Sequence, residues 1–101
     1  MKIVYAPRAL RDIDEILSYI HQRSPRGAHA VSQAIEHTIE LCALNPRATA
    51  RTNVPNLYRR PLSKYRYTVF YRVLAGQQGI EVARIIHGAR VKDLHTLPDD
   101  D

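Results

Sequence analysis

A two-residue alternation from Tyr65 to Val73 is the feature of this sequence that most restricts its fold. Apolar and aromatic residues fill the odd positions, and arginine, threonine and phenylalanine fill the even ones. β-Branched and aromatic residues in this pattern predict a β-strand with two different faces. A polar connector with a glycine near each end, residues 75–79, separates it from a second apolar run, Ile80–Ile86. We therefore expect an antiparallel hairpin.

Two amphipathic helices are predicted before this hairpin. A stripe of apolar residues at helical spacing follows Pro7, which suits a first helical position, and predicts a helix to about Arg23. The stripe consists of Leu10, Ile13, Ile16, Leu17 and Ile20. Ser24 and Pro25 are typical of the N-cap and first position of a second helix, expected to end near Leu44. Because the link is so short, the two helices should form an antiparallel hairpin.

The charged residues of the first helix are interpreted as a solvated face. Arg8 and Asp12, and likewise Arg11 and Glu15, are four residues apart and are therefore neighbours on a helix surface. In both pairs the cation comes first, which is the weaker order for such pairs. We expect all four side chains to face water.

The remaining segments complete a fold of the α+β class. Lys2–Tyr5 is predicted to be a strand, and Arg47–Asn56 a loop. Leu57–Leu62 is predicted to be a short strand that Pro61 confines to an edge or to an early end. Residues 1–101 are expected to form a single domain, with 91–101 as a loosely held acidic tail. The expected order is β-α-α-β-β-β, with a helical hairpin packed on a small, mainly antiparallel sheet.

Cationic residues are concentrated in one part of the chain. The net charge is +5, and no acidic residue lies between Glu40 and Glu81. Seven cationic residues lie in that interval, namely Arg47, Arg51, Arg59, Arg60, Lys64, Arg66 and Arg72. Such a stretch favours an anionic partner, either a nucleic acid or an acidic protein segment. The alternative is a solvated cationic face with no dedicated partner.

The candidate binding residues come from this stretch and from the end of the second hairpin strand. They are Arg59, Arg60, Lys64, Arg66, Arg72, His87 and Arg90. The aromatic residues Tyr58 and Phe70 alternate with the arginines, a combination that can stack bases and hold phosphates. The alternative is that Tyr67 and Tyr71 belong to the core and that the arginines protect a sheet edge from aggregation.

Other kinds of site are not indicated. The five histidines lack the spacing of zinc ligands, so neither a metal nor a cofactor is expected. The single cysteine, Cys42, falls at an apolar helical position and is interpreted as a buried structural thiol. No apolar run reaches membrane-spanning length and no export signal is recognised, so a cytoplasmic protein is expected.

Lys2 to about Arg90 resembles the RelE/ParE toxin superfamily of bacterial type II toxin–antitoxin modules, and is most similar to the ParE branch. The resemblance rests on four pieces in a fixed order. These are the opening IVYAPRALRDIDEILSYI, the second helix beginning at Ser24-Pro25, the strand YRYTVFYRV and the closing IIHGAR.

The resemblance implies two alternative activities. RelE-like toxins cleave messenger RNA on the ribosome, and matching positions here would give Arg59, Arg90 and His95 as a residual catalytic set. Thr68 and Pro61 stand where those enzymes carry an arginine and a lysine, and no tyrosine follows Tyr71. ParE-like toxins, which mostly poison DNA gyrase, lack most of that set. We therefore expect a ParE-like toxin with no catalytic residues of its own; a plain nucleic-acid-binding module is a third possibility.

The resemblance also implies a partner protein. Toxins of this kind are neutralised by a cognate antitoxin, whose C-terminal segment we expect to be disordered until it binds, giving a hetero-oligomeric complex. We expect that segment to lay a helix in a groove between the helical hairpin and the sheet, or to add a strand to a sheet edge. Carboxylates on the segment would then face the acid-free stretch.

Overall fold

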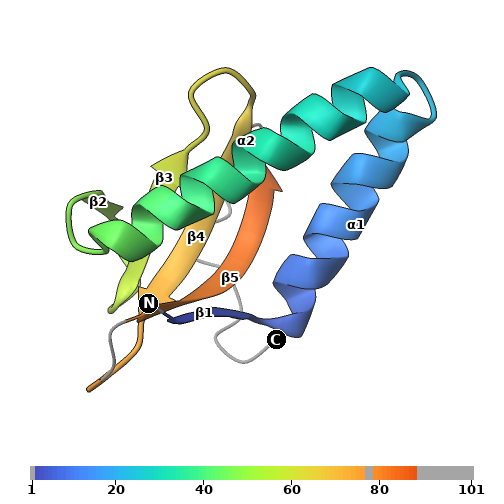
Figure 1. Ribbon diagram of the computed structural model, residues 1–101. Coiled ribbons are helices and arrows are strands. Elements are labelled where there is room, and N and C mark those ends of the chain that lie inside the picture. The colour runs from blue at the N-terminus through green and yellow to red at the C-terminus, as the bar shows by residue number, and fades with distance from the viewer. Residues whose placement is uncertain (1, 77–78, 89–101) are drawn as a thin grey trace.

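Five strands form one mixed sheet in the order β1-β5-β4-β3-β2 (Figure 1). The computed structural model describes residues 2–76 and 79–88. The strands are β1 (Lys2–Tyr5), β2 (Ala50–Arg51), β3 (Leu57–Pro61), β4 (Tyr67–Val73) and β5 (Gly79–His87). β1 pairs with β5 in parallel, and the other neighbours pair antiparallel. The predicted α+β class and mainly antiparallel sheet are confirmed.

The two helices lie against one face of the sheet as an antiparallel hairpin. α1 (Pro7–His21) contacts β5, and α2 (Pro25–Leu44) crosses in front of β3 and β4 (Figure 1). The Ser24 hydroxyl accepts a hydrogen bond of 2.9 Å from the amide of Gly27, as expected for an N-cap. α2 has the predicted bounds, whereas α1 ends two residues before the expected Arg23.

The main core lies between the helices and the sheet. From β4 it receives Val69, Tyr71 and Val73, the odd positions of the alternating stretch. They pack with Ile35 and Ile39 from α2, each at most 3% exposed. The prediction that the odd face is apolar core is confirmed, because a strand points alternate side chains to opposite faces.

A second, smaller cluster occupies the opposite face of the sheet. It consists of Leu57, Phe70, Ala83 and Ile86, with Val54 packed against it. Phe70 is 0% exposed and Tyr58 only 6% exposed, so neither ring is available to stack on a base. Of the two interpretations that the sequence left open, the one in which Tyr58 and Phe70 stack on bases is therefore wrong.

Two further predictions about surface and loop were wrong. The loop from Arg47 to Asn56 contains the short strand β2, which pairs with Tyr58 and Arg59 of β3. On α1, Leu10 is 54% exposed while Asp12 is buried, the reverse of the predicted arrangement.

No helix within residues 2–76 and 79–88 is both long and apolar enough to cross a membrane.

Candidate binding surfaces

The predicted cationic residues do not share one surface. Arg59 lies on the same side of β3 as Leu57, facing away from the helices, because residues two apart in a strand share a face. Arg60 lies on the helix side, where its charge favours the ionised forms of Tyr71 and Cys42. The structure therefore separates the two adjacent arginines between opposite faces of the sheet.

The other predicted binding residues are divided between the two ends of β4. Lys64 and Arg66 are exposed in the β3–β4 turn, and the Arg66 carbonyl accepts a hydrogen bond of 2.6 Å from the Gly88 amide, beside His87. Arg72 lies near the other end, with Nη1 3.8 Å from the Glu81 carboxylate. The structure thus brings Arg66 close to His87, with Lys64 in the same turn as Arg66, and leaves Arg72 apart.

The residual ribonuclease set is represented by a single described residue. Arg59 is half-buried on β3, whereas Arg90 and His95 lie outside the described residues. Thr68, where the ribonucleases carry an arginine, is only 8% exposed. Among residues 2–76 and 79–88, no group of three or more His, Cys, Asp or Glu side chains is arranged to hold a metal ion.

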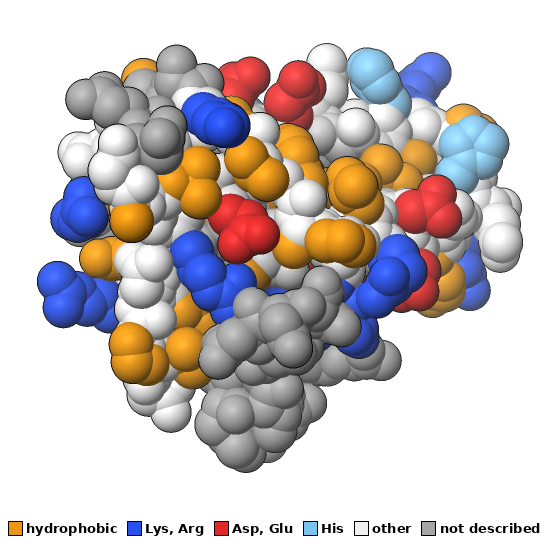
Figure 2. All heavy atoms as spheres, turned by 90° about the horizontal axis from the view of Figure 1, so that it is seen from below, with side chains coloured by type: hydrophobic (Ala, Val, Ile, Leu, Met, Phe, Trp, Pro, Cys, Tyr) orange, Lys and Arg blue, Asp and Glu red, His pale blue; other side chains and the backbone are white. Residues whose placement is uncertain are grey.

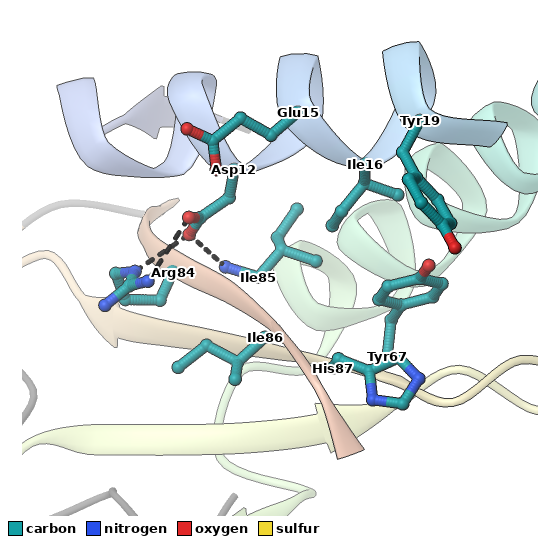
Figure 3. Close-up of a pocket in the computed structure, with 9 residues that line it drawn as sticks. All are labelled: Asp12, Glu15, Ile16, Tyr19, Tyr67, Arg84, Ile85, Ile86 and His87. Atoms are coloured by element: carbon teal, nitrogen blue, oxygen red, sulfur yellow. Dashed lines mark hydrogen bonds and ion pairs between the residues drawn. The ribbon is translucent and has the colours of Figure 1, made fainter. Parts of the chain in front are cut away.

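A buried ion pair, which the sequence did not reveal, holds α1 to the part of β5 that does not pair with β1. Asp12 Oδ2 accepts hydrogen bonds from Arg84 Nε at 2.8 Å and from the Ile85 amide at 2.9 Å (Figure 3). β1 pairs with β5 only as far as Val82, and a β-bulge opposite Phe70 follows. The Asp12 carboxylate therefore takes the place of a strand at this edge, which limits unwanted strand pairing.

A cleft of about 390 Å³ lies between α1 and the end of β5. Figure 3 shows the hydroxyl groups of Tyr19 and Tyr67 facing one another across it. The Tyr67 ring meets the His87 ring edge-on, with centroids 5.4 Å apart. Burial raises the pKa of Tyr67, and the nearby Tyr19 raises it further, so the phenol stays protonated at neutral pH. The cleft therefore combines neutral phenol groups and an aromatic wall with the charged side chains of Asp12, Glu15 and Arg84.

A groove on another side of α1 is lined mainly by apolar residues. It is bounded by β1, α1 and α2, and has a volume of about 310 Å³. Its lining residues are Tyr5, Leu10, Ile13, Ser32, Ile35, Glu36 and Ile39. Figure 2 views the molecule from below, the side on which β1 lies, and shows hydrophobic side chains in a band with both acidic and basic side chains beside it. We give the name β1–helix groove to the hollow lined by these seven residues.

Polar contacts attach the loop after α2 to the core. The Tyr71 hydroxyl donates to the Pro46 carbonyl at 2.6 Å and lies 2.7 Å from the Thr49 hydroxyl. Burial raises the pKa of Tyr71 to about 12, although the hydrogen bond to Thr49 opposes this. Burial likewise raises the pKa of Cys42 to about 11, against the opposing charge of Arg60. Cys42 is 0% exposed, so its interpretation as a buried structural thiol is confirmed.

Comparison with known proteins places these surfaces in context. The family model described as "ParE toxin of type II toxin-antitoxin system, parDE" matches residues 3–92. A comparison with curated proteins found no match. The solved chromosomal ParDE toxin–antitoxin system from P. aeruginosa contains a chain with a TM-score of 0.73 and 20% identity, over 86% of this chain and 95% of that one. The isolated E. coli RelE toxin has a TM-score of 0.61 and 16% identity, over 93% and 90%.

Proposed function

The chain belongs to the ParE toxin family of type II toxin–antitoxin systems, and from this membership we propose that it inhibits growth by poisoning DNA gyrase in the cytoplasm. The match across residues 3–92 is the observation that carries the proposal. The fold that this chain shares with the RelE toxin favours neither gyrase poisoning nor RNA cleavage, because one fold can carry several functions.

The side chains support a mechanism without catalysis by the toxin itself. General acid–base cleavage of RNA needs positioned groups that exchange protons near neutral pH. Arginine does not do so, so Arg59 and Arg90 of the residual ribonuclease set cannot act as the acid or the base, which leaves His95 as its single titratable member. The buried Thr68 supplies no charge that could stabilise a phosphate. A RelE-like ribonuclease is therefore the rival outcome of the test below.

Induced expression of the toxin without its antitoxin is expected to stop growth, induce the SOS response and accumulate gyrase–DNA complexes. Messenger RNA should stay intact during the first minutes, because no cleavage step is involved. Primer extension on ribosome-bound messages and immunoprecipitation of gyrase-linked DNA measure the two effects side by side. Cleaved messages with no trapped gyrase would instead assign the chain to the ribonucleases.

We further propose that the cognate antitoxin binds through a C-terminal segment that folds on binding, in a hetero-oligomeric complex. Ordering such a segment costs conformational entropy, so apolar contacts must supply most of the net affinity. Charges on the toxin surface would mainly speed association and select the partner. Arg59, Lys64 and Arg66 are the candidates on the sheet face and the β3–β4 turn, with Arg60 and Arg72 nearby in sequence.

Reversing charge at Arg59 and Arg66 together is expected to slow antitoxin association about tenfold at low salt and to reduce its salt dependence. The physical reason is the loss of long-range attraction to carboxylates on the antitoxin. Stopped-flow mixing over a range of salt concentrations measures both quantities. Arg26→Glu, at an exposed position on α2, combined with Arg23→Glu in the interhelix link, is the matched control. An equal slowing in the control would show that only net charge matters.

A further inference from the structure

Three arginines gather on the helix side of the sheet, where the loop after α2 leads into β2 (Figure 1). The guanidinium carbon of Arg51 lies 5.9 Å from the centre of the Tyr58 ring, and that ring stacks on Tyr71 with centroids 5.7 Å apart. Burial raises the pKa of Tyr71 and the charge of Arg60 opposes this shift, so Arg60 lies on the same side of the sheet. The third arginine, Arg47, lies in the loop itself. We call Arg47, Arg51 and Arg60 the arginine cluster.

The core holds the loop that carries Arg47 in a fixed position. The Tyr71 hydroxyl donates to the Pro46 carbonyl at 2.6 Å and lies 2.7 Å from the Thr49 hydroxyl, so it holds the loop on both sides of Arg47. β2 follows directly and pairs with β3. The backbone under the cluster is therefore already ordered before any partner binds, which lowers the entropic cost of binding.

No carboxylate of the described part of the chain neutralises the arginine cluster. Among residues 2–76 and 79–88, acidic residues occur only on α1, α2 and β5, and none of them forms an ion pair with a member of the cluster. Arg47 and Arg51 are exposed, and Arg60 is half-buried. A positive potential that neighbouring acids do not cancel attracts a polyanion from a distance.

We propose that the arginine cluster binds the phosphate backbone of duplex DNA, so that the toxin contacts DNA as well as gyrase in the trapped complex. The role in that complex rests on the proposed function, because DNA is the polyanion present wherever gyrase is poisoned. The planar fork of an arginine donates two parallel hydrogen bonds to one phosphate, a geometry that lysine does not offer. Contacts to the backbone carry no sequence information, so the binding should not depend on base sequence.

The exposed residues around the cluster favour DNA over an acidic protein segment. Apart from its two arginines, the stretch 45–51 exposes only Asn45, Ala48 and Ala50. Leu44, directly before this stretch, adds a single exposed apolar side chain. A protein segment that folds on binding needs apolar contacts for most of its net affinity. Phosphate binding depends on charge and counterion release instead, and small alanines leave room for a phosphate backbone to approach.

The affinity of the toxin for a short labelled DNA duplex, measured by fluorescence anisotropy over a range of salt concentrations, tests the DNA contact. Arg47→Gln with Arg51→Gln should weaken binding about tenfold at low salt. It should also reduce the slope of log affinity against log salt by about 2, the value for two lost phosphate contacts. Arg23→Gln with Arg26→Gln is the matched control, since both pairs are exposed and one arginine of each lies over a tyrosine ring. The control should change the affinity about twofold or less.

Two further measurements separate lost charge from lost structure and connect the cluster to gyrase. Arg47→Lys with Arg51→Lys keeps both charges, so it should keep the salt slope of the unchanged toxin. Purified gyrase with supercoiled plasmid measures the trapped complexes, which should fall about tenfold with the glutamine pair and remain with its control. Thermal unfolding checks that each variant is folded.

The outcomes distinguish failure of the DNA contact from failure of the proposed function. An equal salt slope for the unchanged toxin and the glutamine pair would overturn the DNA contact, whereas trapped gyrase would still support the proposed function. Duplex binding that needs the cluster, without trapped gyrase, would support the DNA contact and overturn the proposed function. Preference for single-stranded RNA over duplex DNA would assign the cluster to RNA and overturn the inference. Unchanged duplex binding with slower antitoxin association would assign the cluster to the antitoxin and overturn it equally.

Discussion

Replacing Asp12 with alanine is expected to lower the free energy of unfolding by about 3–5 kcal/mol. The substitution leaves the Arg84 guanidinium, whose side chain is 13% exposed, without the carboxylate that now lies 2.8 Å away. It also removes the acceptor of the buried Ile85 amide. Breaking a buried pair on one side is costly because the remaining charge stays in a poorly solvated place. Urea unfolding followed by circular dichroism measures the loss.

Asp14→Ala is the matched control for this prediction, since it makes the same change on the exposed side of α1. Its effect should stay within about 0.5 kcal/mol. The double change Asp12→Leu with Arg84→Met removes both charges and should cost less than Asp12→Ala alone. If Asp12→Ala and Asp14→Ala are equally stable, the ion pair does not hold α1 to β5.

The thiol of Cys42 is expected to react roughly 100-fold more slowly with a disulfide reagent at pH 8 in the folded protein than in urea. Burial raises its pKa to about 11, which lowers the fraction of reactive thiolate, and its exposed fraction is 0%. Cys42 is the only cysteine of the chain, so every labelling event reports on one site. The absorbance of the released thiolate follows the reaction, and equal rates in the two states would contradict the burial.

The raised pKa of Cys42 also fixes the sign of a pH effect on stability. A group whose pKa is higher in the folded than in the unfolded state stabilises the fold while it is protonated. This contribution is complete below about pH 8, near the pKa of an unfolded thiol. It is lost as the pH rises to about 11, the folded value. Labelling of Cys42 should therefore accelerate with pH faster than thiolate formation alone predicts, because alkaline solution also weakens the fold.

The sequence predicts the β4 strand well because both of its faces follow from local chemistry. Val69, Tyr71 and Val73 alternate with polar or charged neighbours, and a strand has a fixed two-residue period. Phe70 breaks the pattern as an apolar residue on the even face, and this was the available signal for the second cluster. The residues that cover the even face of β4 come from segments distant in sequence. The two-residue period of a single strand does not predict which segments these are.

The faces of α1 are harder to predict for a related reason. A helical stripe gives the buried side to within about one residue, and Leu10 and Asp12 lie on its two borders. The choice between them depends on Arg84 and on the Ile85 amide, which lies beyond the β1 pairing and donates to Asp12, and both are distant from α1 in sequence. No local pattern contains that information. For the same reason the sequence grouped Arg59 and Arg60, although adjacent strand positions face opposite ways.

The parallel pairing of β1 with β5 determines when the folded protein can first exist during translation. Lys2 to Tyr5 leave the ribosome before their partners, Gly79 to Val82, are synthesised. The α1–α2 hairpin can form from contacts close in sequence, whereas β1 has to wait until both helices, β3 and β4 have been made. A nascent chain therefore cannot assemble the complete sheet until β5 has left the ribosome.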